Sequence, residues 1–311
     1  MKIYEYKPGT RVAIGASVIA LGFFDGVHKG HRSLLMTAKR ATCERGLTFA
    51  VFTFPAENGF KGGGALYPTS EKLALLDSLG VEAVIMAEFG SVSKVSAEDF
   101  VNHSLIEDMN CSVAVAGYDF RFGKGALGNT TLLSEILSSR ERECIVEDEH
   151  RINGEKISTS KIKELLRLGN PMEACEFLGY PYYLRGTVEH GRGVGTALGF
   201  PTLNTNIDAD SAYLKRGVYR TVTEISGVRY NSITNVGVCP TFKTRPLHAE
   251  TYIIDYSGDL YGKEIRIFFI DYMREEKAFS SEKELIMQIN VDKNRAIKEN
   301  GEIKWQEIGL S

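Results

Sequence analysis

Residues 21–35, with the sequence LGFFDGVHKGHRSLL, decide how the first half of the chain folds. An apolar run ends at Gly22, two histidines follow at His28 and His31, and apolar residues return from Leu34 onward. This order predicts a strand, a turn and a helix that carries both histidines at its first turn. A helix N-terminus offers unpaired N–H groups and the positive end of a dipole, so phosphate is the ligand that it favours.

A phosphate site is favoured over two alternatives for His28 and His31. Gly30, between them, leaves out a side chain where a phosphate chain would otherwise meet Cβ. The chain has only six histidines, so two of them around a glycine directly after an apolar strand indicate more than polar residues on a helix turn. A zinc pair would need a third ligand, such as the glutamate of H-E-x-x-H, and the neighbouring residues supply none.

The composition limits the class of protein and its partners. A chain of 311 residues has room for roughly two domains, each large enough to bury a core. Its 43% hydrophobic and 25% charged residues are typical of a globular protein. The net charge of −3, without any run of lysine or arginine, argues against nucleic-acid and membrane partners. Any affinity for phosphate therefore has to be local.

The cysteines and the N-terminal region indicate a cytoplasmic protein. Five cysteines lie far apart without a C-x-x-C pair, which is typical of reduced thiols. The uncharged stretch 12–24 follows basic residues, as in a signal peptide, but it continues into the histidine turn without a cleavage site. We interpret it as the first strand. No apolar stretch reaches the ~20 residues of a membrane helix.

Strands and helices alternate through the first half of the chain. Strands are expected at residues 47–54, 81–89 and 111–117, with a helix before Gly80 and another that begins at Ser96. This alternation predicts an α/β domain with a parallel, doubly wound, Rossmann-like sheet. Ligands of such sheets lie beyond the carboxyl ends of the strands.

Two further polar segments follow in this half. Residues 117–125, GYDFRFGKG, combine glycines, aromatics and the carboxylate of Asp119 directly after a strand. The alternative interpretation is that this segment is a solvated loop without a binding role. Residues 157–166, ISTSKIKELL, begin a helix with three hydroxyl side chains, which are also the usual caps of a helix.

The sequence pattern changes near Tyr180 from alternating strands and helices to short β-rich runs. We therefore expect one domain at residues 1–179 and a second at 180–311. Short β-rich runs separated by turn residues predict a small antiparallel barrel. A final helix opens with a capping box at Ser281 and Glu284. The β-rich runs are 183–188, 218–225, 232–236, 250–255 and 265–270.

A glycine cluster near the start of this second domain matches no standard nucleotide motif. Its spacing is not G-x-G-x-x-G, a proline stands where a helix would begin, and no Gly-Lys-Ser/Thr follows. A glycine-rich flap that lays backbone amides on phosphates remains as the interpretation. The residues concerned are Gly191, Gly193, Gly195, Gly199 and Pro201.

Thr202 and Asn204 follow this cluster in an extended segment. Because they are two residues apart, their side chains share one face. A hydroxyl and an amide oxygen placed in this way suit Mg²⁺ beside ATP phosphates, or a pair that stabilises a turn. The spacing alone leaves both possibilities open.

Several motifs carry a resemblance to a known family. The segment FFDGVHKGH resembles the H-x-G-H motif of the nucleotidyltransferases, in the longer form found in prokaryotic bifunctional riboflavin kinase/FMN adenylyltransferases. The segments around GFPTLNTN, NVGVCPTF, AETYIIDYSGDLYGKEIRIFF and MREEKAF are similar to the riboflavin kinase module. Together the motifs extend over residues 12–298.

The resemblance implies a transferase that phosphorylates riboflavin to FMN and adenylylates FMN to FAD, using ATP and Mg²⁺. It implies that His28 and His31 stabilise charge on phosphates, that Glu250 is the general base of the kinase, and that Thr202 and Asn204 ligate magnesium. The glycine cluster, with Pro201, would bind the nucleotide of the kinase. The other implied adenylyltransferase residues are Phe24, Asp25, Gly26, Gly30, Gly117, Asp119, Phe120, Ser158, Thr159, Ser160 and Lys163.

Two positions depart from the family pattern. Lys163 stands where the family has an arginine, and Glu57 aligns with a family histidine. One alternative is therefore a working kinase with a weakened or lost adenylyltransferase site, and another is a flavin- or nucleotide-binding regulator without turnover. We expect riboflavin, FMN and ATP as partners, and a monomer or a weak homo-oligomer.

Overall fold

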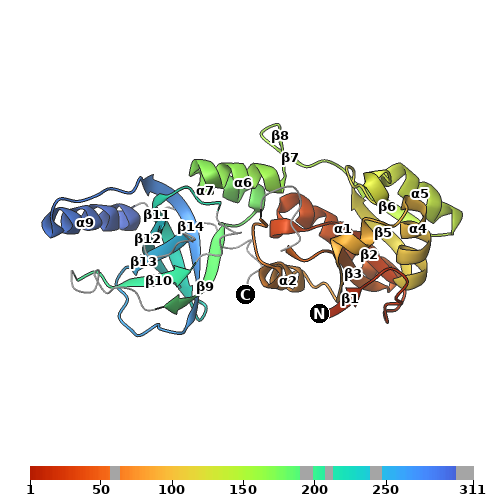
Figure 1. The fold of residues 1–311 in the computed structure, drawn as a ribbon, viewed down its shortest axis with the longest axis horizontal. Coiled ribbons are helices and arrows are strands. Elements are labelled where there is room, and N and C mark those ends of the chain that lie inside the picture. The colour runs from red at the N-terminus through yellow and green to blue at the C-terminus, as the bar shows by residue number, and fades with distance from the viewer. Residues whose placement is uncertain (57–63, 190–198, 207–212, 239–246, 299–311) are drawn as a thin grey trace. The chain divides into compact units, whose positions relative to one another are not determined.

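The computed structural model describes residues 1–56, 64–189, 199–206, 213–238 and 247–298 (Figure 1). The chain separates into two compact units, Met1–Thr159 and Ser160–Gly309. The boundary expected between residues 179 and 180 divides the chain by activity, whereas the compact units divide it by contacts. The expected boundary stays a prediction.

The first unit is built on a six-stranded parallel sheet in the order β1-β4-β3-β2-β5-β6, as predicted. Its central strand β2 is buried along its whole length, which explains the uninterrupted apolar run before the histidine turn. The strands are β1 Lys2–Tyr6, β2 Ser17–Leu21, β3 Thr48–Thr53, β4 Ala83–Ala87, β5 Cys111–Gly117 and β6 Glu143–Glu147.

Helices connect these strands. Helix α1 packs on β2 and β5, and α5 packs on β6. The helix expected from Ser96 is present but changes type. The Ser96 hydroxyl caps the short α4, and the chain then continues as the π-helix η3. The helical segments are η1 Asp25–Val27, α1 Lys29–Arg45, α2 Thr69–Ser78, α3 Phe89–Val92, α4 Ala97–Asp99, η3 Phe100–Asp108, η4 Lys124–Ala126 and α5 Thr130–Ser139. A small hairpin, β7 Arg151–Ile152 and β8 Glu155–Lys156, leads to α6.

The second unit contains a closed antiparallel barrel in the order β10-β13-β12-β11-β14-β9, again as predicted. Ser281 caps the last helix, α9, by accepting the Glu284 N–H at 3.3 Å, while the Glu284 carboxylate bonds Ser280 instead of closing the box. The elements are α6 Thr159–Leu168, α7 Pro171–Leu178, β9 Tyr183–Glu189, β10 Thr202–Asn206, β11 Gly217–Ile225, β12 Val228–Val238, β13 Leu247–Ile253, β14 Glu264–Arg274 and α9 Glu282–Lys298.

A row of hydroxyl side chains crosses one buried face of the barrel. They are linked one to the next by hydrogen bonds of 2.8–2.9 Å, in an order that runs from β11 to β13 through β12. Each of them is at most 1% exposed, so each depends on its neighbours for hydrogen bonding. In spatial order they are Thr223, Ser232, Thr221, Thr234 and Thr251.

Candidate active sites

The turn between β2 and α1 places both histidines of the motif. Phe24 and Val27 adopt positive φ angles of 53° and 39° there, and both side chains are completely buried. Such angles are unfavourable for these residues, so the surrounding packing has to hold the turn. His28 ends the turn as the N-cap of α1, where its Nδ1 accepts the N–H of His31 at 3.2 Å.

The N-cap bond fixes which nitrogen of His28 carries the proton. Because Nδ1 acts as an acceptor, the neutral ring has its proton on Nε2, which can donate to a ligand. The His31 ring stacks on it, with centroids 3.6 Å apart and an angle of 12° between the planes. A Cβ added to Gly30 would lie 3.4 Å from the His28 ring, so a glycine at this position avoids a tight contact with that ring.

Both imidazoles are neutral near pH 7. Burial lowers the pKa of His28 to about 4, and the positive charge of Lys156 acts in the same direction. Burial also lowers the pKa of His31 well below its usual range, helped by the charges of His28 and Lys72. The buried Nδ1 of His31 has no hydrogen-bond partner among the described residues. A buried polar atom of this kind is costly without a ligand.

The two imidazoles share one cavity of about 270 Å³. Its wall brings together segments from the ends of β2, β5 and β6 and from the start of α6, in agreement with the expected edge of the sheet. Seven residues expected for the site lie in this wall: His28, Gly30, His31, Gly117, Asp119, Ser158 and Thr159.

Four other expected residues of the first unit do not line the cavity. Phe24 packs edge-on against His31 at 5.3 Å between ring centroids. Asp25 is buried and accepts the N–H of Leu66 at 2.8 Å, while its carbonyl oxygen accepts the Thr159 hydroxyl at 3.2 Å. Phe120 stacks with an aromatic neighbour and packs on the core. Gly26, with a φ of 74°, forms the middle of the turn.

Several residues of this wall were not expected from the sequence. Lys156, directly before the ISTS segment, contacts Asp119 at 2.5 Å and lies 4.8 Å from the Tyr118 ring centroid. Its position next to a predicted motif is the one signal that could have indicated it. It brings a cation to a cavity whose imidazoles are neutral.

A second unexpected residue, Glu147, ends β6. It accepts hydrogen bonds from the hydroxyls of Ser33 and Thr37 on α1 and from His150 Nε2. Burial raises the pKa of this carboxyl, but the three hydrogen bonds outweigh burial and lower it overall. The carboxylate therefore stays ionised at the edge of the cavity.

The remaining expected residues of the first site are described separately. Ser160 and Lys163 belong to the second unit, where the Lys163 amine lies 4.8 Å from the Tyr213 ring centroid. Glu57 lies outside the described residues.

The second unit has its own cavity of about 250 Å³ between the outer face of the barrel and α9. Among the described residues, seven apolar and seven polar side chains line it. The apolar residues are Phe200, Val218, Ile233, Tyr252, Phe279, Leu285 and Ile289, and the polar residues are Thr202, Asn235, Glu250, Arg274, Glu276, Lys277 and Asp292.

Strand pairing brings the expected kinase residues together. Asn204 on β10 lies opposite Glu250 on β13, and Thr202 lies opposite Tyr252. Directly opposite residues of an antiparallel pair point to the same face, so Thr202, Asn204 and Glu250 share the outer face of the barrel. The Asn204 Oδ1 also accepts a hydrogen bond from His248 Nε2 at 2.6 Å, a contact that the sequence did not indicate.

The oxygen donors at this edge fit a magnesium ion. A threonine hydroxyl and an asparagine carbonyl oxygen, next to a carboxylate, are the hard ligands that Mg²⁺ takes in proteins. Gly199 and Pro201 lead into this strand, and Gly199 uses its freedom to adopt a φ of 83°. The other three glycines of the cluster, Gly191, Gly193 and Gly195, lie outside the described residues.

Comparison with known proteins agrees with the two-unit architecture. A family model described as FAD synthetase matches residues 12–161, and one described as riboflavin kinase matches residues 178–299. The chain is 34% identical to the bifunctional riboflavin kinase/FMN adenylyltransferase of Bacillus subtilis, over 91% of this chain and 92% of that protein. It belongs to the bifunctional riboflavin kinase/FMN adenylyltransferase family. The member from Listeria monocytogenes is also 34% identical, over 88% of this chain and 90% of its own length. As in that family, the chain carries both transferase domains.

A solved structure shares the fold along nearly the whole chain. The crystal structure titled a macrolide-efflux protein from Streptococcus pneumoniae matches with a TM-score of 0.85 and 27% identity, covering 96% of this chain and 99% of that one. Among the residues that the structure describes here, no helix has the length and apolar character needed to span a membrane.

Proposed function

We propose that this chain makes FAD from riboflavin in two ATP-dependent steps. Residues 180–311 phosphorylate riboflavin to FMN, and residues 1–179 transfer AMP from ATP to FMN with release of pyrophosphate. The observation that supports this assignment is that each unit has its own cavity, with the groups that its reaction needs. Riboflavin, FMN and ATP are its small-molecule partners. A monomer or weak homo-oligomer without a nucleic-acid partner stays our prediction.

In the kinase cavity, the apolar side chains contact the flavin ring, and Thr202 and Glu250 face the reacting groups. Glu250 accepts the proton of the riboflavin 5′-hydroxyl as its oxygen attacks the γ-phosphorus of ATP and ADP leaves. Thr202 and Asn204, on the same face, would hold Mg²⁺. When bound, that ion neutralises charge on the β- and γ-phosphates.

In the adenylyltransferase cavity, a phosphate oxygen of FMN attacks the α-phosphorus of ATP and pyrophosphate leaves. The acceptor is already an anion, so no general base is required. His28 donates from Nε2 to a phosphate oxygen, in the tautomer that its N-cap bond imposes. Lys156 contacts the phosphates from its ion pair with Asp119. The buried His31 Nδ1 gains a partner when a phosphate enters.

The proposal is tested by incubating the protein with riboflavin, ATP and Mg²⁺ and separating FMN from FAD by chromatography. We expect both products, with FMN appearing before FAD. FMN without FAD would indicate a kinase whose adenylyltransferase site is lost, as the departures at Lys163 and Glu57 would allow. Flavin binding without any product would indicate a regulator and contradict the proposal.

A further inference from the structure

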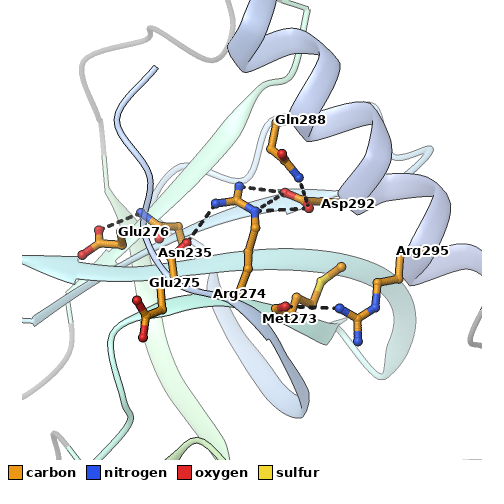
Figure 2. A network of polar contacts seen from close by, with 8 residues as sticks. All are labelled: Asn235, Met273, Arg274, Glu275, Glu276, Gln288, Asp292 and Arg295. Carbon is orange, nitrogen blue, oxygen red and sulfur yellow. Dashed lines mark hydrogen bonds and ion pairs between the residues drawn. The ribbon is translucent and has the colours of Figure 1, made fainter. Parts of the chain in front are cut away.

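One ion pair joins the end of β14 to α9 beside the kinase cavity (Figure 2). The Arg274 Nε lies 3.2 and 3.0 Å from the two carboxylate oxygens of Asp292, and Nη2 lies 2.8 Å from Oδ2. Gln288, one turn earlier on α9, donates to Oδ1 of the same carboxylate at 2.9 Å. We call Arg274, Asp292 and Gln288 the α9 clamp.

The clamp is a specific contact and not a solvated ion pair. Asp292 is only 5% exposed, and a buried carboxylate is tolerated where a fixed set of donors surrounds it. The fork of the Arg274 guanidinium and the Gln288 amide supply that set. Such a bidentate geometry restricts both the position and the rotation of α9.

Arg274 organises a second part of the cavity wall as well. Its Nη1 donates to the carbonyl oxygen of Glu275 at 3.1 Å, and its guanidinium carbon lies 5.9 Å from the ring centroid of Phe279. The same side chain therefore links the end of β14, the segment after it and α9. The segment after β14 and helix α9 both contribute residues to the cavity wall.

The apolar contact between α9 and the barrel is small. It centres on Ala296, which packs in a cluster with Val218, Ile233 and Ile254. The wall residues Ile289 and Leu285 lie about two and three turns earlier on the helix and are only partly buried. Packing at Ala296 alone leaves this earlier part of the helix free to tilt, and the α9 clamp removes that freedom.

We propose that Arg274 and Asp292 are positioning residues for riboflavin. By fixing α9, they hold Leu285 and Ile289 at the separation from the barrel that a flat tricyclic ring requires. The inference rests on the proposed kinase function of the second unit. It assigns the pair no contact with ATP and no part in proton transfer.

A second ion pair provides a matched control. Arg295 on α9 contacts Asp271 on β14 at 3.2 Å and donates to the Met273 carbonyl oxygen at 3.2 Å. It joins the same helix to the same strand, but within the described residues neither Arg295 nor Asp271 borders the cavity. Breaking it removes an ion pair between the same two elements at a point away from the cavity wall.

The test compares Asp292→Asn with Asp271→Asn in the full chain. For Asp292→Asn we expect the KM and Kd for riboflavin to rise by roughly ten- to a hundredfold, which is about the effect of losing one apolar contact in a hydrophobic pocket. The kcat, the KM for ATP and the conversion of FMN to FAD should stay within about twofold of the parent. The Kd is measured by quenching of riboflavin fluorescence. Gln288→Leu, which removes one donor and no charge, should raise the Kd in the same direction by less.

Four outcomes separate the possibilities. An equal loss of riboflavin affinity in Asp292→Asn and Asp271→Asn would overturn the inference and leave a merely structural ion pair. A fall in kcat with an unchanged KM for riboflavin in Asp292→Asn would also overturn it. If Asp292→Asn does not fold, Gln288→Leu with an unchanged Kd decides against the clamp. Failure of the unmodified chain to bind or phosphorylate riboflavin would instead contradict the proposed function.

Discussion

The two cavities have to bind the same nucleotide under the proposed function, yet their polar groups differ. The first contains stacked neutral imidazoles at the start of α1, and its wall carries Lys156 together with the acidic side chains of Asp119, Glu147, Asp148 and Glu149. The second contains the carboxylate of Glu250 and the hydroxyl of Thr202 in its wall, and Asn204 lies opposite Glu250 on the neighbouring strand.

This difference follows from the acceptors of the two reactions. A phosphate monoester such as FMN is ionised at neutral pH, so its site has to stabilise charge and does not need a base. The riboflavin hydroxyl is neutral and must lose its proton, so its site needs a carboxylate within reach. Under the proposed function, Glu250 is therefore the base of the second unit, and the first unit needs none.

The largest effect is expected for Glu250→Gln. Removal of the general base should lower FMN formation by about 10²- to 10⁴-fold. The conversion of added FMN to FAD should continue, because the other cavity lies in the other unit. Product chromatography measures both steps. Glu264→Gln, which breaks an exposed ion pair with Arg185 on the same barrel, is the control. Loss of both reactions in a folded protein would contradict two independent sites.

The next effect concerns His31→Ala. Loss of this ring removes a phosphate contact and the stacking partner of His28, and should lower FAD formation by about a hundredfold or more. Phosphorylation of riboflavin should be unchanged. His103→Ala on η3, which removes an exposed histidine paired with Glu107, is the control. FAD formation within a few-fold of the parent in His31→Ala would show that the assigned role is wrong.

A smaller effect is expected from pH. The pKa of His28 is about 4 in the folded protein and ~6.5 in the unfolded chain. As the pH falls below ~6.5, His28 therefore becomes protonated in the unfolded state but stays neutral in the folded state. This single group should lower the free energy of unfolding by about 2 kcal/mol between pH 7 and pH 5.

His28→Asn tests this pH dependence, because asparagine keeps an N-cap acceptor but does not titrate. Hydrogen exchange of the β2 and β5 amides, corrected for intrinsic rates, reports the stability of the first unit at each pH. The asparagine variant should lose about 2 kcal/mol less than the parent over this range. An identical loss in both proteins would contradict the assignment of a neutral, buried His28.

The smallest effect is expected for Lys163→Arg. The substitution restores the arginine of the family pattern. Its guanidinium can donate two parallel hydrogen bonds to a phosphate, whereas the lysine ammonium acts as a single point charge. We expect the KM for ATP in FAD formation to fall by a few-fold, with no change in FMN formation. Lys161→Arg, on the same helix, is the control. An unchanged or higher KM would indicate that Lys163 does not contact the nucleotide.

The order of the central elements could be predicted because each is marked by local sequence. A parallel sheet is predicted by the apolar run before Gly22, the histidine turn and the strands that follow. The edge strands β1 and β6 were missed because each has one side toward solvent. Their sequences KIYEY and ECIVE therefore mix charges with apolar residues.

The candidate sites were predicted as motifs, but not as three-dimensional arrangements. Local spacing indicated His28, His31 and Thr202 as candidates, and their positions depend on a single turn or strand. Lys156 and Asp292 were missed because each reaches its cavity through pairing or helix packing between distant segments. Sequence reasoning also grouped Phe24 with the lining residues, whereas its apolar ring is buried behind the histidines.

The hydroxyl row inside the barrel limits how this domain can change during evolution. Thr221 stands in the middle of the row, so replacing it with valine would leave the hydroxyls of Ser232 and Thr234 each short of one partner. Networks of this kind lose more on a single change than on a joint one. The five positions should therefore covary as a group, and barrels that replace one hydroxyl with an apolar side chain should replace the neighbouring ones as well.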